Sequence, residues 1–287
     1  VGISSPVSLW DTGALAKSLP TGDYVLVGDL DPEIAEAAVL GWRLGMYEFD
    51  RYRSPAGDAA RLAVPDGVDA VRIAALADAT MLVRDLINTP ANDLGPAALA
   101  DAARQLAEKF SAGYDVTVGE DLLKNNYPAI HAVGRAAQDA PRLIEMTWGN
   151  PSHPTVALVG KGVCFDSGGL DIKPASGMKL MKKDMGGAAL VLGIAALLMG
   201  AKVRVRLRVL IPAVENSIAG NAIRPLDVIT SRSGKTIEIG HTDAEGRVIL
   251  ADALSEAARE NPRLIIDFAT LASFGTSTTT VCIPGRC

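Results

Sequence analysis

Two short segments of the chain bring acidic, basic and glycine residues within a few positions of one another. The first, Lys161–Gly169, reads KGVCFDSGG and is followed by Lys173 and Asp184. The second, His241–Arg247, reads HTDAEGR. Glycine lets the backbone approach a ligand closely, while carboxylates and lysines supply ligand atoms and charge. Both segments are therefore candidate parts of one functional site.

Four carboxylates in these segments would repel one another strongly if the fold brought them together. They are Asp166, Asp184, Asp243 and Glu245. A divalent metal ion supplies the compensating positive charge, and two ions supply more of it. Asp243 and Glu245, two residues apart in a turn, can point to a common centre. The alternative for this pair is an ordinary first helical turn, where the helix dipole favours acidic residues.

Three basic residues in or near the same segments could act on a bound substrate. Lys161, Lys173 and Arg247 can stabilise negative charge that develops in a transition state. A phosphate-binding loop is disfavoured, because the GxxxxGK[ST] pattern is absent. Cys164 fits a small buried hydrophobic residue better than a nucleophile, and Met181 fits the core better than a ligand contact.

The elements around the two segments indicate an α/β fold. A continuous apolar run, Thr155–Gly160, predicts a buried strand directly before the first segment. The second segment lies between a short predicted strand, Thr236–Gly240, and a predicted helix, Ala244–Glu260. Ligands of open α/β sheets bind beyond the carboxyl ends of strands, and both segments begin there. We expect a mixed β-sheet flanked by helices.

Three further elements are predicted in this part of the chain. Gly186–Met199 predicts a buried helix, and Val203–Ile211, which alternates with period two, predicts a strand with one polar face. Arg263–Ala269 predicts another buried strand. We expect no further regular element after it.

The residues before this part predict a small, partial α/β region and a linking helix. The small region contains a strand, a helix and a connector: Tyr24–Gly28, Pro32–Tyr47 and Arg51–Asp69. Ala70–Ile87 is a strong helical pattern that ends before Pro90, because the residue before a proline leaves the helical region. The predicted divisions of the chain are a partial N-terminal region, a linking helix and a catalytic domain: residues 1–70, 71–88 and 89–287.

Composition excludes several classes of protein. The 287 residues carry 28 Lys+Arg and 33 Asp+Glu, a net charge of −5, whereas proteins that bind nucleic acids are usually basic. The three histidines lie far apart, which argues against a His-rich zinc site. Three unclustered cysteines indicate a reducing, cytoplasmic compartment. The uncharged apolar stretch Gly186–Ala201 is shorter than the ~20 residues that span a bilayer, so we expect no membrane segment.

Taken together, these segments resemble the leucyl aminopeptidase family, the metallo-exopeptidases of the M17 type. The matching blocks are VGKGVCFDSGGLD (Val159–Asp171), Lys173, MKLMKKDMGGAA (Met178–Ala189) and TDAEGR (Thr242–Arg247). Further matches are RDLINTPANDLGP (Arg84–Pro96), IIDFATL (Ile265–Leu271) and, more weakly, YEFDRY (Tyr47–Tyr52). The resemblance covers the chain from about residue 40 to residue 271.

The resemblance implies a two-metal aminopeptidase that uses zinc, with manganese or magnesium able to replace one ion. The tighter ion would be held by four residues: Lys161, Asp166, Asp184 and Glu245. The more exchangeable ion would be held by three: Asp166, Asp243 (also through its carbonyl) and Glu245. Lys161 must be neutral to act as a ligand, so its pKa, ordinarily ~10.4, would have to fall.

The catalytic roles are implied in the same way. A hydroxide activated by the two ions would attack the peptide carbonyl. Lys173 would stabilise the oxyanion, and Arg247 would hold a bicarbonate ion that acts as general base. The residues implied to contact substrate are Lys173, Met181, Asp184 and Thr270. The implied partners are peptides with a free N-terminus, leucine-like residues among those released, and further copies of the chain, a hexamer in the intact family.

The chain departs from the family in two places. At His241 the motif usually has Asn; the histidine either replaces a hydrogen bond or alters the surroundings of the metal. After Leu271 the sequence diverges, and the family's catalytic domain continues well beyond that point, so we expect the chain to be truncated at its C-terminus. Two alternatives stay open: a non-catalytic fragment of such an enzyme, and another two-metal hydrolase such as a phosphoesterase.

Overall fold

The structure is a computed structural model that describes residues 8–28, 30–54, 57–271 and 277–282. The chain divides into two compact units, Val1–Asp85 and Leu86–Cys287. The long helix α3, Ala70–Asn88, contributes residues to both. The helix predicted at Ala70–Ile87 is confirmed, whereas the three-part division of the chain stays a prediction.

The first unit contains two further helices and a pair of short parallel strands. These elements are α1 (Leu9–Ser18), β1 (Gly22–Tyr24), α2 (Pro32–Gly45) and β2 (Ala60–Leu62). The start of α2 follows from its sequence, because the Asp31 carboxylate accepts a hydrogen bond from the Glu33 amide and Pro32 occupies the first turn.

Two predictions for this unit are wrong in part: the strand at Tyr24–Gly28 and the connector at Arg51–Asp69. β1 ends at Tyr24, and the apolar residues Val25 and Val27 that follow are exposed. β2 lies inside the predicted connector and pairs with β1. A three-residue parallel pair is too short to leave a periodic pattern, so only the tertiary structure reveals it.

The second unit is built on a mixed sheet with seven strands among the described residues. They are β3 (Gly113–Val118), β4 (Arg142–Trp148), β5 (Thr155–Gly160), β6 (Gly162–Asp166), β7 (Arg206–Asn216), β10 (Leu264–Thr270) and β11 (Ser277–Cys282). The order across the sheet is β11-β10-β5-β7-β4-β3, and β6 also pairs with β7. β10, β5 and β7 are parallel neighbours, while β11, β4 and β3 are antiparallel to theirs.

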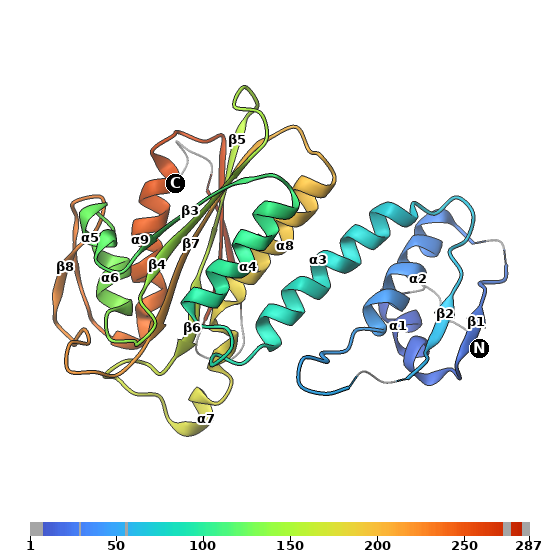
Figure 1. Ribbon diagram of the computed structural model, residues 1–287, viewed down its shortest axis with the longest axis horizontal. Coiled ribbons are helices and arrows are strands. Elements are labelled where there is room, and N and C mark those ends of the chain that lie inside the picture. Colours follow the sequence, from blue (N-terminus) through green and yellow to red (C-terminus); the bar gives the residue numbers. More distant parts are fainter. Residues whose placement is uncertain (1–7, 29, 55–56, 272–276, 283–287) are drawn as a thin grey trace. The chain divides into compact units, whose positions relative to one another are not determined.

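Helices cover both faces of this sheet (Figure 1). One face carries α4 (Pro96–Lys109) and α8 (Gly186–Gly200), and the other carries α6 (Pro128–Gly134) and α9 (Glu245–Ala258). The smaller elements are α5 (Asp121–Lys124), α7 (Ala175–Met178), the 3₁₀ turns η1 (Met181–Met185) and η2 (Thr242–Ala244), and the hairpin of β8 (Val228–Thr230) and β9 (Thr236–Glu238). The predicted α/β fold class with a mixed sheet flanked by helices is confirmed.

The glycine- and alanine-rich helix α8 packs against β5 and β10 in the interior of this unit. By length and composition, the stretch Met181–Gly200 could cross a membrane, with a mean hydropathy of 1.4 in its most apolar window. That window is 61% buried inside the protein. One such helix is a weak indication of a membrane segment, because the core helix of a soluble protein has the same length and composition.

The strand predicted at Val203–Ile211 is confirmed over Arg206–Ile211, but its predicted bounds and its predicted polar face are wrong. β7 begins at Arg206, and its residues are buried on both faces from Leu207 to Val214. Arg208 is only 6% exposed, and its guanidinium lies 2.9 Å from Glu145 and 3.3 Å from Glu256. Because a buried arginine is tolerated when carboxylates pair with it, the alternating charges in this run do not mark a solvated face.

The expectation that no element follows the strand predicted at Arg263–Ala269 is also wrong. β11 pairs antiparallel with β10 and forms one edge of the sheet. Its run of threonines is typical of a strand, because β-branched residues fit a pleated surface. The divergent residues Ala272–Phe274 lie outside the described part of the chain.

Candidate metal centre

Lys161 lies at a break between two strands that share a neighbour. β5 and β6 both run parallel to β7, and Lys161 is the single residue between them. Its amide donates to the Phe268 carbonyl in β10 (2.9 Å), and its carbonyl accepts from the Ala188 amide in α8 (2.9 Å). The side chain extends past the first turn of α9, where a Cβ on Gly246 would lie 2.6 Å from Lys161 Cε. The sheet and two helices therefore fix this lysine.

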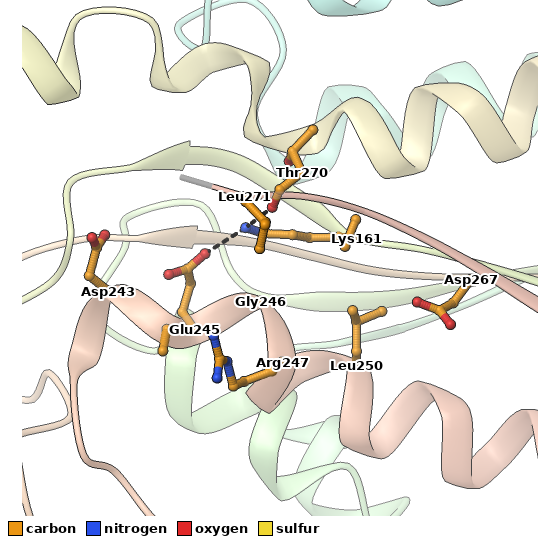
Figure 2. A pocket seen from close by; sticks show the side chains of 11 residues that line it. Lys161, Asp243, Glu245, Gly246, Arg247, Leu250, Asp267, Thr270 and Leu271 are labelled. Carbon is orange, nitrogen blue, oxygen red and sulfur yellow. Dashed lines mark hydrogen bonds and ion pairs between the residues drawn. The ribbon is translucent and has the colours of Figure 1, made fainter. Parts of the chain in front are cut away.

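Three buried carboxylates from different elements converge beside Lys161. Asp166 ends β6, Asp184 lies in η1 and Glu245 begins α9, and none is more than 1% exposed. One oxygen of each lies within 4.8 Å of those of the other two. Lys161 Nζ is 2.7 Å from Asp184 Oδ2 and 2.9 Å from Glu245 Oε1. It also donates to the Thr270 carbonyl (3.1 Å), as Figure 2 shows.

Lys173 and Asp243 lie at the edge of this cluster. Lys173 Nζ is 3.0 Å from Asp166 Oδ2 and also bonds the Asp243 carboxylate. The Asp243 side chain is 28% exposed and lines a cavity of about 250 Å³ that Arg247 also lines. Of the four carboxylates that the sequence singles out, the structure thus brings three into direct proximity and joins Asp243 to them through Lys173.

The buried charges shift one another's pKa values. Burial raises the pKa of Glu245 to about 8, and Asp166 and Asp184 add to the shift while Lys161 opposes it. Burial also raises the pKa of Asp184, against the attraction of Lys161. Burial alone would lower the pKa of Lys161, but Glu245 and Asp184 outweigh it and the pKa is raised. The neutral Lys161 that a ligand role requires therefore needs a metal ion to replace the lysine's proton.

The raised pKa of Glu245 predicts how stability depends on pH in the presence of a chelator. The ordinary pKa of this carboxyl is 4.5 and its pKa in the folded chain is about 8, so the folded state retains a proton that the unfolded state releases. The free energy of unfolding should therefore fall as the pH rises from about 5 to about 8. Urea unfolding at both pH values measures this slope. The pKa values of Asp184, Glu145 and Asp252 are also raised and contribute with the same sign, so the slope should become less steep in Glu245→Gln without vanishing. A slope as steep as the original would contradict the assignment.

The donor set fits a divalent cation. Four buried carboxylate oxygens accept no hydrogen bond from any described residue: Asp166 Oδ2, Asp184 Oδ2 and both oxygens of Glu245. Three of the four lie at ion-pair distance from a lysine, and only Glu245 Oε2 has neither contact within the described part of the chain. Carboxylate oxygens are suitable ligands for magnesium, manganese and zinc. These residues could hold one or more such ions.

Asp171 and Thr242 fasten the two segments to each other, although no role was predicted for either residue. Thr242 Oγ1 donates to the Gly168 carbonyl (2.6 Å) and accepts from the Asp171 amide (2.9 Å), while the Thr242 amide donates to Asp171 Oδ2 (2.8 Å). Asp171 and Thr242 are 71 residues apart in the sequence, so no local sequence pattern predicts their contact. His241 Nδ1 accepts from the Asp243 amide (3.2 Å), which agrees with the first alternative raised for this histidine.

The other residues singled out by the sequence take different positions. Thr270 Oγ1 donates to Asp184 Oδ1 (2.8 Å) and so orients this carboxylate. Met181 is 3% exposed, which favours a place in the core, and its contact with substrate stays a prediction. Arg247 is exposed beside the cavity, and its side chain makes no hydrogen bond or ion pair with described residues. Cys164 is buried, as predicted, and burial raises the pKa of its thiol, which argues against a nucleophile.

Comparison with known proteins gives two family models that match the chain. The catalytic domain of the cytosol aminopeptidase family matches residues 81–281. The N-terminal domain of M17 aminopeptidases matches residues 1–65. Among curated relatives, a probable cytosol aminopeptidase from Caulobacter vibrioides is 42% identical in an alignment 266 residues long, and the match covers 87% of this chain and 53% of that protein.

Solved structures agree with this assignment. A cytosol aminopeptidase from Coxiella burnetii superposes with a TM-score of 0.88 at 52% identity, covering 91% of this chain and 57% of that one. The bottromycin maturation enzyme BotP in complex with Mn superposes with a TM-score of 0.75 at 42% identity, covering 82% and 52%. The chain spans about half the length of the relatives it matches. Since the catalytic-domain model covers most of it, the chain belongs to the cytosol aminopeptidase family, M17, as its motifs predicted.

Proposed function

We propose that the chain belongs to a metal-dependent aminopeptidase that hydrolyses N-terminal residues, leucine-like ones among them, from peptides. The observation that carries this proposal is the buried cluster of Asp166, Asp184 and Glu245 beside Lys161. Family membership supports the class of reaction. The activity of the whole protein is part of the proposal, because this chain spans about half the length of its relatives.

The proposed cofactors are two divalent ions, either zinc or manganese, with magnesium as a further choice. A manganese complex of the relative BotP supports this proposal. Lys161, Asp166, Asp184 and Glu245 would hold one ion, and Asp166, Asp243 and Glu245 the other. When bound, the ions would supply positive charge that acidifies water and polarises the peptide carbonyl.

Three basic residues of the chain would stabilise negative charge, release a proton or bind an anion during the reaction. Burial acts to lower the pKa of Lys173, but its bonds to Asp243 and Asp166 outweigh burial and raise it. Lys173 therefore stays charged and can stabilise negative charge on the carbonyl oxygen. Lys161 would give up its proton to become a ligand. Arg247, exposed beside the cavity, would hold the bicarbonate that accepts a proton as general base.

The proposed substrate is a peptide with a free N-terminus. Its amino group would lie near the Asp184 carboxylate, which Thr270 orients, and this contact would restrict cleavage to the first peptide bond. Met181 and Thr270 are the residues we propose next to the side chain that is released. The name of the relatives, cytosol aminopeptidase, supports a cytoplasmic location, and we propose a homo-oligomer, a hexamer, as the assembly.

Hydrolysis of a leucyl anilide by this chain with Mn²⁺ or Zn²⁺ tests the proposal. We expect turnover that a chelator stops, and a loss of more than about a hundredfold in Asp184→Ala, since a direct ligand should matter at least as much as the groups that support it. Asp115→Ala, in which an exposed residue of β3 is replaced, is the matched control.

Each other outcome has a distinct meaning. Equal turnover in Asp184→Ala would overturn the assignment of the site. Turnover of an aryl phosphate without turnover of the anilide would favour another two-metal hydrolase. If the folded chain turned over neither substrate, the alternative of a non-catalytic fragment would replace the proposed activity.

A further inference from the structure

Asn216 lies buried between the two segments of the metal centre, although no motif in the sequence points to it. It is the last residue of β7 and is 2% exposed. Its side-chain nitrogen Nδ2 donates to Asp166 Oδ1 (2.8 Å) and to the Thr242 carbonyl (3.1 Å). Its backbone carbonyl accepts from the amide (3.1 Å) and the hydroxyl (2.7 Å) of Ser167. One residue of the central sheet therefore contacts both segments at once.

These hydrogen bonds decide which oxygen of Asp166 is left for an ion. Oδ1 accepts from Asn216 and also from the Gly168 amide (2.8 Å). Oδ2 accepts no hydrogen bond from the described residues and lies 3.0 Å from Lys173 Nζ. Uncharged donors thus fix one oxygen, while the other faces the charged groups of the cluster. Rotation of this carboxylate would break two buried hydrogen bonds, which is costly.

The chemistry of the site also fixes the orientation of the Asn216 amide. A flipped amide would turn its oxygen toward the Asp166 carboxylate and the Thr242 carbonyl, which are both acceptors. With nitrogen in this position, both Nδ2 hydrogens are used, one by each segment. Leucine has the same branched shape and number of side-chain heavy atoms as asparagine but lacks these donors, and alanine lacks them as well.

We propose that Asn216 is a positioning residue for metal binding, which orients Asp166 and holds the Thr242 turn so that ligands of both segments reach the ions together. This inference rests on the proposed function, because it requires that the cluster binds metal. Groups that hydrogen-bond a metal ligand typically change metal affinity by about 10- to 100-fold. A residue that only filled space would leave the metal affinity unchanged in a folded variant that has the same branched shape.

Calorimetric titration of the chain with Mn²⁺ tests the inference, with Asn216→Leu as the principal variant. Asn221→Leu is the matched control, because Asn221 is exposed and donates its amide hydrogen to the Arg135 carbonyl (2.9 Å) away from the cluster. We expect the dissociation constant for Mn²⁺ to rise by about 10- to 100-fold in Asn216→Leu and to stay unchanged in the control. The rise in melting temperature that Mn²⁺ causes should shrink in parallel. The melting temperature without metal shows whether the variant is folded.

If Asn216→Leu does not fold, Asn216→Ala with Asn221→Ala as control answers the same question, because alanine removes the donors without adding a charge. The side-chain amide protons of Asn216 in the unsubstituted chain give a measurement that needs no variant, since they should shift on addition of Zn²⁺. A dissociation constant within about twofold of the original in a folded Asn216 variant, or no shift of these protons, would overturn the inference alone. An original chain that bound no Mn²⁺ would overturn the proposed function as well.

Discussion

Glutamine in place of Glu245 should abolish metal binding and peptide hydrolysis while making the metal-free protein more stable near pH 8. Glu245 is buried with two other carboxylates, and burial raises its pKa to about 8. The charged carboxylate is therefore unfavourable in the folded, metal-free chain, and glutamine has the same size without the charge. The same substitution should weaken metal binding, because the ion is attracted directly to the negative charge of the carboxylate.

Two measurements separate these opposite effects. The loss of leucyl anilide turnover should exceed about a hundredfold, the upper end for residues that only support a ligand, and calorimetry should show no Mn²⁺ binding. Urea unfolding in chelator near the raised pKa of about 8 should show a higher free energy of unfolding. Glu238→Gln makes the same change at an exposed position in β9. A Glu245→Gln variant that kept its Mn²⁺ affinity and lost stability would contradict the proposed role.

Alanine in place of Gly187 should strongly destabilise the second unit. Gly187 lies in the first turn of α8, where a Cβ would be 2.1 Å from the Phe268 carbonyl oxygen and 2.8 Å from the Lys161 amide nitrogen. Because these two backbone atoms are joined by a hydrogen bond, neither can move without disturbing the other. The cost should exceed ~3 kcal/mol, the upper end for one extra methylene in a packed core. At that cost, the melting temperature falls by roughly 6–12 °C.

Thermal unfolding followed by circular dichroism measures this effect. Gly200→Ala is the control in the same helix, since a Cβ there would be 3.8 Å from the Phe110 ring, an ordinary contact. Alanine is also the better helix former, so the melting temperature of the control should be unchanged or slightly higher. An unchanged melting temperature in Gly187→Ala would show that α8 can move away from β10 without cost.

The parts of the site that could be predicted are those carried by neighbours in the sequence. The apolar run Thr155–Gly160 predicts β5 with its observed bounds, and Lys161 follows directly. Both segments follow predicted strands, so the general position of ligands in α/β sheets indicates that they meet. Asp184 is further along the chain, so the sequence alone groups it with the others by its charge and order, and the resemblance to a family gives it a role as a ligand.

The contacts across the sheet could not be predicted, because they depend on which strands are neighbours. Asn216 reaches Asp166 from 50 residues away, and nothing near it in the sequence marks it as part of the site. Arg208 alternates with apolar residues as a solvated side chain would, but Glu145 and Glu256 pair with it inside the fold. The raised pKa of Lys161 likewise depends on how many carboxylates surround it.

Lys161 lies between β5 and β6, where the pairing with β7 is interrupted. The position of its amine therefore depends on the register of β5 in the sheet. A shift of β5 by one residue against β10 would exchange the side chains of β5 between the two faces of the sheet, so the Lys161 side chain would no longer reach Asp184 and Glu245. An ion bound through Lys161 would therefore hold the central parallel strands in one alignment. Metal release and strand slippage would then be linked equilibria, and the rate of amide exchange in β5 and β10 would report how fully the centre is loaded.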